Sequence, residues 1–534
     1  MLGFDGLDPD LVSQFMDEGK LPNMQKLARD GALQRLETTP SADASAWASF
    51  ATGTNPGKHG VFSDATPYRR GGTAFWTRAG QAGVRSSVLK VPLTFPPEVV
   101  PNGELLAGWP VPDVRDTPGM YSYFAIDVAQ HDDGVARANG VRRRLIFNGD
   151  VARSVLAGPR GLTLPVSIFW NRAGKAATID INGSTIRLEE GEWSKWINLD
   201  FSPSWFAHER GMVEFLLVRA GTSFALYASP VHWRADRPPA PLSSPASLSA
   251  DLYERVGAYR TLGWPDQAVA LDANLIDEKA FMDDVYRAFD DQTQIILQRI
   301  DTHNWDLLVG AIDSVDHVQH LMWRQMGTAK FGDAIERMYQ RCDDTVGEVM
   351  KHVDADTAIV IMSAYGGKGF RQTMDLNRWL AEEGLAGKAS ATLSGGIVLS
   401  PASTGEALAS EDHIIARLTA LLDPQTHAPV VEAVYKREAI YTGPYVPSAP
   451  ALQVGMAEGY RVGVSSATSP TALAPNPGKW SADHSSVDYN AVPGTLISSR
   501  PTTTDSPRVI DIAPTVLRYF GVPIPTEIDG TPLF

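Results

Sequence analysis

An apolar run followed at once by a polar segment constrains the fold more than any other feature of the sequence. Residues 305–312, Trp-Asp-Leu-Leu-Val-Gly-Ala-Ile, are nearly all apolar, which is typical of a strand buried on both faces of a parallel sheet. Asp316 and His320 come next, four residues apart, so a helix that begins near Ser314 places both on one face. Open α/β sheets hold their ligands at the carboxyl ends of strands, where this pair lies.

The pair has two interpretations. A carboxylate and an imidazole on one helix face suit a divalent ion of the zinc or manganese type. Alternatively, Asp316 caps the helix and His320 is an ordinary polar residue on its flank, because short motifs of this kind often occur by chance.

Other stretches extend the same alternation of strands and helices. Met1–Phe4 has the pattern of a buried strand that ends at Asp5-Gly6, and residues 357–363 predict another buried strand. Asp5 is either a metal ligand or a turn residue, and alone it favours the turn. Helices are predicted for residues 8–19, 23–31, 277–299, 329–352 and 511–521. Together these elements predict an α/β fold with a mostly parallel central sheet.

Between residues 115 and 245 the pattern changes. Short apolar or alternating stretches separated by Gly and Asn turns predict antiparallel strands, followed by the Pro-rich linker 237–241. The stretches are residues 162–170, 178–183, 192–196, 213–218 and 224–227. We therefore predict that residues 115–245 form a β-rich insertion in a core built from residues 1–114 and 246–534.

Charge and composition exclude several classes of partner. The net charge of −15 and the pI of about 5.2 argue against nucleic acid and against an anionic membrane surface. Cys342 is the single cysteine, so no internal disulfide is expected. There is no run of 18 or more apolar residues and no signal peptide, so we expect a cytoplasmic protein without a transmembrane segment. The first strand is short, which leaves open that native residues precede Met1.

Several motifs, spread over nearly the whole chain, resemble one known family. They occur in the family's order and resemble the type I phosphodiesterase/nucleotide pyrophosphatase family of the alkaline phosphatase superfamily. The resemblance implies an alkaline-phosphatase-like α/β sandwich. The main motifs are Asp5-Gly6-Leu7, Ala46-Trp47, Thr52-Gly53-Thr54-Asn55-Pro56-Gly57-Lys58-His59-Gly60, Asp316-x-x-x-His320 and Ser481-Ala482-Asp483-His484.

The resemblance implies two metal ions, roughly 4 Å apart, that share a phosphate. One ligand set maps onto Asp316, His320 and His484, and all three residues are present. The other set comprises a first-strand Asp, a nucleophilic Ser or Thr, and an Asp-His pair after the second strand. Asp5 matches the first of these.

Three positions of that second set depart from the family pattern. The Asp-His pair falls on Ala364 and Tyr365, and the nucleophile position, four residues before Trp47, holds Asp43. Alanine offers no ligand, and a neutral phenol is a weak one at ordinary pH. The carboxylate of Asp43 would repel a phosphate dianion, although it could also ligate a cation or attack phosphorus.

These departures leave two expectations for the function. The first is a phosphodiesterase-like protein that keeps one divalent ion rather than two, zinc or else manganese, and is catalytically impaired or a pseudoenzyme. The alternative is an active phosphodiester or phosphomonoester hydrolase that uses a mononuclear site or Asp43. The expected partner is a phosphate-containing small molecule or none, and the sequence does not indicate an oligomeric state.

Overall fold

The computed structural model of the chain describes residues 1–39, 43–63, 70–137, 140–204, 207–264, 267–400, 410–464 and 471–534. The chain divides into two compact units. The first comprises Met1–Leu93, Val100–Gly103 and Arg299–Phe534, and the second comprises Thr94–Val99 and Glu104–Gln298. The insertion boundaries predicted from the sequence, residues 115 and 245, remain a prediction.

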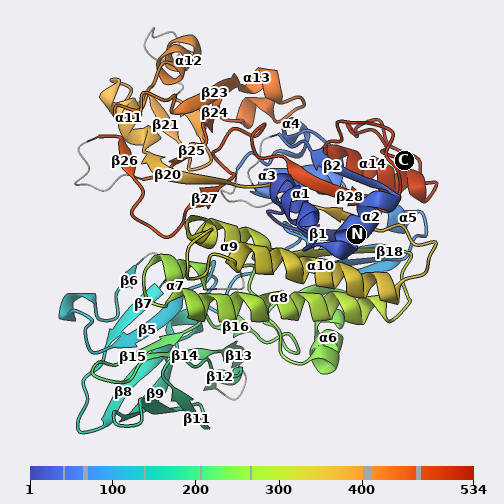
Figure 1. The fold of residues 1–534 in the computed structure, drawn as a ribbon. Helices are drawn as coiled ribbons and strands as arrows, with labels where there is room; N and C mark the ends of the chain where they lie inside the picture. Colours follow the sequence, from blue (N-terminus) through green and yellow to red (C-terminus); the bar gives the residue numbers. More distant parts are fainter. Residues whose placement is uncertain are drawn as a thin grey trace. The chain divides into compact units, whose positions relative to one another are not determined.

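A mostly parallel sheet forms the centre of the first unit (Figure 1). β1 pairs in parallel with β18 and β19, β18 pairs in parallel with β3, and β28 runs antiparallel to β19 and β2. Every residue of β1, β18 and β19 is buried, as expected for strands covered on both faces. The predicted α/β class and mostly parallel sheet are therefore confirmed. The strands of this sheet that lie in the first unit are, in sheet order, β3 (Ser86–Leu89), β18 (Leu307–Ile312), β1 (Leu2–Phe4), β19 (Val360–Met362), β28 (Gly494–Ser498) and β2 (Ala32–Leu36).

The register of these strands brings their carboxyl ends to one edge of the sheet. Phe4 lies opposite Ile312, and Gly3 lies opposite Met362. The segments that begin at Asp5, Asp313 and Ser363 therefore leave the sheet side by side. This edge is where an open α/β sheet places its ligands.

The helices near this edge begin largely where the sequence predicts. Asp8 caps α1, since its Oδ1 accepts hydrogen bonds from the amides of Asp10 (2.9 Å) and Leu11 (3.1 Å). α9 begins at Ser314, but its N-cap position is Asp313, so Asp316 does not cap it. The helices of the first unit are α1 (Pro9–Asp17), α2 (Pro22–Asp30), α3 (Asp43–Thr52), α4 (Pro56–His59), α5 (Phe75–Gln81), α9 (Ser314–Met322), α10 (Ala334–His352), α11 (Leu376–Glu382), α12 (Glu411–Thr419), α13 (Arg437–Ile440) and α14 (Ile512–Tyr519).

One helix starts later than predicted. α10 begins at Ala334 rather than at residue 329. Gly327 and Phe331 adopt positive φ angles of 75° and 63°, which belong to turns and not to a right-handed helix.

Two smaller sheets complete the first unit. β20 (Lys368–Met374) pairs with β25 (Gly459–Val462), β26 (Leu473–Pro475) and β27 (Ala482–Asp483). The other sheet has the order β21-β22-β24-β23 and packs with α11 and α12 around a separate apolar core. Its strands are β21 (Ala389–Ala391), β22 (Gly396–Leu399), β23 (Val431–Lys436) and β24 (Leu452–Met456).

The second unit is rich in antiparallel strands. Its sheets have the orders β11-β10-β9-β8, β12-β13-β16 and β14-β15-β5-β7-β6, and β17 pairs antiparallel with β4. The strand predicted for residues 192–196 is wrong: this segment is a loop in which Trp193 makes one isolated bridge to Leu216. The elements are β4 (Gly103–Leu106), β5 (Tyr121–Ala125), β6 (Ala136–Arg137), β7 (Gly140–Arg144), β8 (Val151–Ala157), β9 (Thr163–Asn171), β10 (Ala176–Ile181), β11 (Ser184–Glu189), β12 (Ile197–Ser204), β13 (Ala207–Val213), β14 (Phe215–Arg219), β15 (Ala225–Ala228), β16 (His232–Trp233), β17 (Ser243–Ser244), α6 (Leu248–Val256), α7 (Ala268–Asp272) and α8 (Glu278–Ile300).

No helix in the described ranges is both long and apolar enough to span a bilayer.

Candidate metal centre

Three of the predicted ligands converge at the carboxyl edge of the central sheet. Asp316 and His320 lie one turn apart on α9, directly after β18, and His484 follows β27. One potential ligand atom from each residue lies within 4.8 Å of the other two, and all three side chains are buried. Asp316 and His320, which are four residues apart, thus form one cluster with the distant His484.

The nitrogen and oxygen atoms of this cluster lie close to one another. Nε2 of His320 is 3.0 Å from Oδ2 of Asp316, and Nε2 of His484 is 3.5 Å from Oδ1 of the same carboxylate. Nδ1 of His320 lies 2.7 Å from the carbonyl oxygen of Ala482. Because a carbonyl oxygen only accepts, Nδ1 carries the hydrogen, and Nε2 is the nitrogen directed at the carboxylate.

The carboxyl group of Asp316 remains ionised despite its burial. Burial alone raises the pKa of a carboxyl group, but the nearby imidazoles of His320 and His484 outweigh this effect and hold the pKa of Asp316 below its usual range. An ionised carboxylate beside two imidazoles is the donor set expected of a divalent metal site.

Backbone packing fixes Asp316 against the first strand. Gly6, with φ of 78°, follows β1, and a Cβ atom at this position would lie 2.7 Å from the Cα of Asp316. The side-chain Nε2 of Gln319 donates to the carbonyl oxygen of Gly6, and the hydroxyl of Tyr339 donates to Oε1 of Gln319 (2.9 Å). The turn after β1 is therefore fastened to α9, and glycine is required where the two meet.

His484 reaches the cluster because β27 pairs with the start of β20. Asp483 lies opposite Lys368 in this antiparallel bridge, and the amide of Ser481 donates to the carbonyl oxygen of His320 (2.6 Å). The carboxylate of Asp483 accepts hydrogen bonds from the amide and hydroxyl of Ser486 and pairs with Arg461.

Asp483 is also ionised. Burial raises the pKa of its carboxyl group. The Arg461 guanidinium and the neighbouring histidines lower this pKa by more than burial raises it, so the pKa lies below its usual range. Its contacts fix the backbone that carries His484, the next residue.

Asp5 lies at the same edge but has a different partner. Its Oδ1 accepts a hydrogen bond from Nε1 of Trp47 (3.1 Å), and its amide donates to the carbonyl oxygen of Ile312. Among the described residues, the group that could hold an ion comprises Asp316, His320 and His484 without Asp5. The metal role expected for Asp5 remains a prediction.

Asp43 opens α3, but its side chain lies outside the described part of the structure. Its assignment to the nucleophile position therefore remains a prediction. Nearby, His59 is buried: its Nε2 lies 3.0 Å from the hydroxyl of Ser49, and its Nδ1 accepts from the amide of Val61. These contacts agree with a structural role for His59.

Tyr365 and Trp480 are neighbours of the cluster that the sequence did not reveal. The ring of Tyr365 stacks on His484 with a centroid distance of 3.8 Å and an interplanar angle of 7°. Trp480 stacks on His320 at 4.0 Å and 27°. Ala364 and Tyr365 are fully buried. Sequence spacing could not predict these stacks, because each joins residues more than one hundred positions apart.

The residues present fit a divalent ion. One carboxylate oxygen and two imidazole nitrogens converge on a common point, and three protein ligands of this kind are typical of a catalytic zinc site with an open fourth position. The Ala482 carbonyl oxygen that holds Nδ1 of His320 is the kind of orienting contact that metal-binding histidines make.

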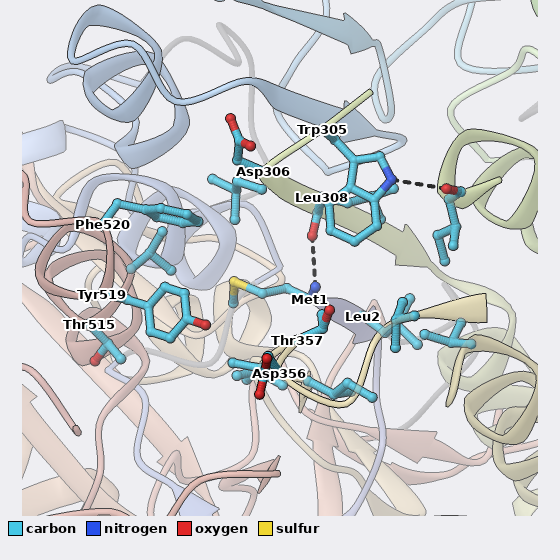
Figure 2. A pocket seen from close by; sticks show the side chains of 18 of the residues that line it. Met1, Leu2, Trp305, Asp306, Leu308, Asp356, Thr357, Thr515, Tyr519 and Phe520 are labelled. Carbon is cyan, nitrogen blue, oxygen red and sulfur yellow. Dashed lines mark hydrogen bonds between the residues drawn. The ribbon is translucent and has the colours of Figure 1, made fainter. Parts of the chain in front are cut away.

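A separate cavity of about 490 Å³ lies at the other end of the central sheet (Figure 2). Leu2, Leu307 and Val360, the first residues of β1, β18 and β19, line it together with Tyr519 and Phe520 near the end of α14. The amino group of Met1 donates to the carbonyl oxygen of Leu308 (2.7 Å) beside it. Because ligands of such sheets bind at the carboxyl ends of the strands, this cavity is not part of the candidate centre.

The sequence profile of one protein family matches most of the chain. It is described as type I phosphodiesterase/nucleotide pyrophosphatase, and the matched residues are 1–109 and 168–485. These ranges contain Asp5, Asp43, Asp316, His320 and His484. No curated protein is similar enough in sequence to count as a match.

Several solved structures resemble the chain at low sequence identity. Phosphonoacetate hydrolase from Sinorhizobium meliloti 1021, in complex with phosphonoformate, is 14% identical, with 96% of this chain and 93% of that chain covered and a TM-score of 0.49. Murine ectonucleotide pyrophosphatase/phosphodiesterase 5, in an inactive form in complex with AMP, is 10% identical, with 98% and 95% covered and a TM-score of 0.46. The alkaline phosphatase PafA is 12% identical, with 100% and 97% covered and a TM-score of 0.43. Likenesses this distant do not indicate which substrate this chain accepts.

Proposed function

The chain belongs to the type I phosphodiesterase/nucleotide pyrophosphatase family, and from that membership we propose that it binds one divalent metal ion and hydrolyses phosphoesters poorly or not at all. Asp316, His320 and His484 hold the ion, which is zinc or else manganese. The molecule that the bound ion attracts is a phosphate-containing small molecule.

One observation carries this proposal. Tyr365 stands at a position where the family resemblance expects a metal-binding histidine, and its ring stacks face to face on His484. Ala364, at the expected aspartate position, has no ligand atom. A neutral phenol is a weak ligand because phenols ionise only near pH 10. These two residues support a site for one ion rather than two.

The nucleophile position supports the same conclusion. The resemblance places Asp43 where family members carry a Ser or Thr hydroxyl. A carboxylate there repels a phosphate dianion, whereas a neutral hydroxyl does not. The proposed site holds one ion rather than two, so it lacks the positive charge with which a second ion would offset this carboxylate.

The three ligands have distinct roles in this proposal. Asp316 supplies the negative charge, His320 is oriented by the Ala482 carbonyl oxygen, and His484 completes the donor set. When bound, the ion supplies a positive charge that attracts phosphate oxygens.

The alternative is an active hydrolase with a mononuclear site. The donor set favours it, because three protein ligands with an open position are typical of catalytic zinc. In that case Asp43 is the first candidate for the nucleophile.

Hydrolysis of bis-p-nitrophenyl phosphate separates the two functions. Purified protein and the Asp316→Ala variant are assayed in parallel with added zinc or manganese. We expect rates at or close to background in both proteins, because the proposed function is poor or absent hydrolysis. Turnover far above background in the wild type that is lost in Asp316→Ala would establish the alternative.

A further inference from the structure

Aromatic rings lie flat against both histidines of the candidate centre. Tyr365 covers a face of His484 with nearly parallel rings, at 3.8 Å and 7°, and Trp480 covers a face of His320 at 4.0 Å and 27°. The two imidazoles are 5.3 Å apart between centroids. Each ligand ring therefore has its own aromatic neighbour from another part of the chain.

We propose that Tyr365 is a positioning residue that holds the imidazole of His484 in its metal-binding orientation. This inference rests on the proposed metal site. Tyr365 then acts as a stacking partner for a ligand, at a position where the family resemblance expects a ligand itself.

The physical reason lies in the freedom of a histidine side chain. Rotation about the terminal torsion of His is soft, so an imidazole needs a contact to fix the direction of Nε2. A parallel ring at 3.8 Å blocks that rotation on one face. In addition, an imidazole that binds a metal gains positive charge, and the electron-rich face of a phenol ring stabilises it.

The backbone around Tyr365 keeps its ring in place. The hydroxyl of Ser363 donates to the carbonyl oxygen of Tyr365 (2.6 Å), and the amide of Gly366 donates to the carbonyl oxygen of Val492. The ring is fully buried, so it has no room to swing away from His484.

His320 is held by a ring and by a hydrogen bond. Its Nδ1 donates to the Ala482 carbonyl oxygen, and Trp480 is itself covered by Arg461, whose guanidinium carbon lies 5.2 Å from the indole centroid. The Tyr365 ring lies against His484 and not against His320. We therefore expect loss of the Tyr365 ring to weaken metal binding through the His484 imidazole.

The test compares Tyr365→Leu with Tyr365→Phe. Zinc affinity is measured by competition with a chromophoric chelator, and the visible spectrum of the cobalt-loaded protein reports the coordination geometry. We expect Tyr365→Leu to bind zinc about tenfold more weakly, as for other residues that orient metal ligands, and to alter the cobalt spectrum. Tyr365→Phe keeps the ring and should stay within about twofold of the wild type.

Tyr441→Leu is the matched control. Tyr441 is also buried, and its ring contacts Phe62 in an edge-on geometry at 5.0 Å. Its truncation should leave zinc affinity and the cobalt spectrum unchanged. If Tyr365→Leu does not fold, Tyr365→Met fills the same space with a flexible chain and takes its place.

The outcomes separate this inference from the proposed function. Wild-type protein that binds no zinc or cobalt would overturn both. Wild-type binding together with equal affinity and an equal cobalt spectrum in the Leu or Met variant would overturn the positioning role alone. Loss of affinity in Tyr365→Phe equal to that in Tyr365→Leu would also overturn it, because stacking would then not be the cause.

Discussion

The charged neighbours of a buried side chain decide whether it keeps its charge in the first unit. Asp316 keeps its charge because two imidazoles face it, whereas burial and the positive charge of Arg70 keep His59 neutral. Burial lowers the pKa of His59 to about 3, and the positive charge of Arg70 contributes to the shift. The difference follows from the partners and not from the degree of burial.

The neutral His59 makes stability depend on pH. Unfolded histidine has a pKa of about 6.5, so between pH 6.5 and 3 the unfolded chain binds more protons than the folded chain. The stability that the neutral, buried His59 contributes is fully present above pH 6.5 and is lost progressively as the pH falls below 6.5. We expect a loss of about 2 kcal/mol between pH 7 and pH 5, measured by urea unfolding at both pH values.

The variant His59→Gln tests this assignment. It should reduce the difference in unfolding free energy between pH 7 and pH 5 by most of that amount. His131→Gln, in which the replaced side chain is exposed, should leave the difference unchanged. An unchanged pH dependence in His59→Gln would show that another group is responsible.

At the scale of elements, the turn after β1 is packed against α9. Gly6 has a positive φ, and a Cβ atom added to it would meet the Cα, Cβ and Oδ1 atoms of Asp316 at 2.7, 2.9 and 3.0 Å. We expect Gly6→Ala to displace Asp316 and to weaken zinc binding about tenfold, measured by chelator competition.

Gly19→Ala is the control for backbone strain. Gly19 has a similar φ of 73°, but a Cβ atom there meets nothing within 4 Å. This variant should lose about 1 kcal/mol of stability from the left-handed conformation and keep full zinc affinity. Equal zinc affinity in the two variants would mean that the contact between Gly6 and Asp316 does not position the ligand.

Elements with strong local signals were predictable from the sequence. The apolar run at residues 305–312 gave β18 (Leu307–Ile312), and the capping pattern at Asp8-Pro9 gave α1. The late start of α10 was not predictable, because the positive φ of Phe331 belongs to a turn that a Phe does not signal. The loop at residues 192–196 was mistaken for a strand because tryptophan is a residue type that favours strands, although Trp193 and Trp196 are three residues apart and do not alternate.

The candidate site was predictable only in part, because only some of its contacts have a local signal in the sequence. Helical spacing alone placed Asp316 and His320 on one face, but His484 entered through the resemblance to a family. The stacks of Tyr365 and Trp480 depend on β20 pairing with β27, and this long-range pairing has no local signal in the sequence.

At the scale of the whole molecule, the candidate centre belongs entirely to the first unit. Asp316, His320, His484 and Tyr365 all lie in the segment Arg299–Phe534. The second unit contains a buried group of ion pairs, in which Arg260 pairs with Glu214 and Asp284 at 2.8 Å each.

The metal content of the purified protein tests the single-ion site most directly. After loading with zinc and removal of free metal, elemental analysis by mass spectrometry should give one zinc per chain for the wild type and for the His131→Ala control, and none for His484→Ala. Two ions per chain in the wild type, or one ion retained in His484→Ala, would contradict the single site formed by Asp316, His320 and His484.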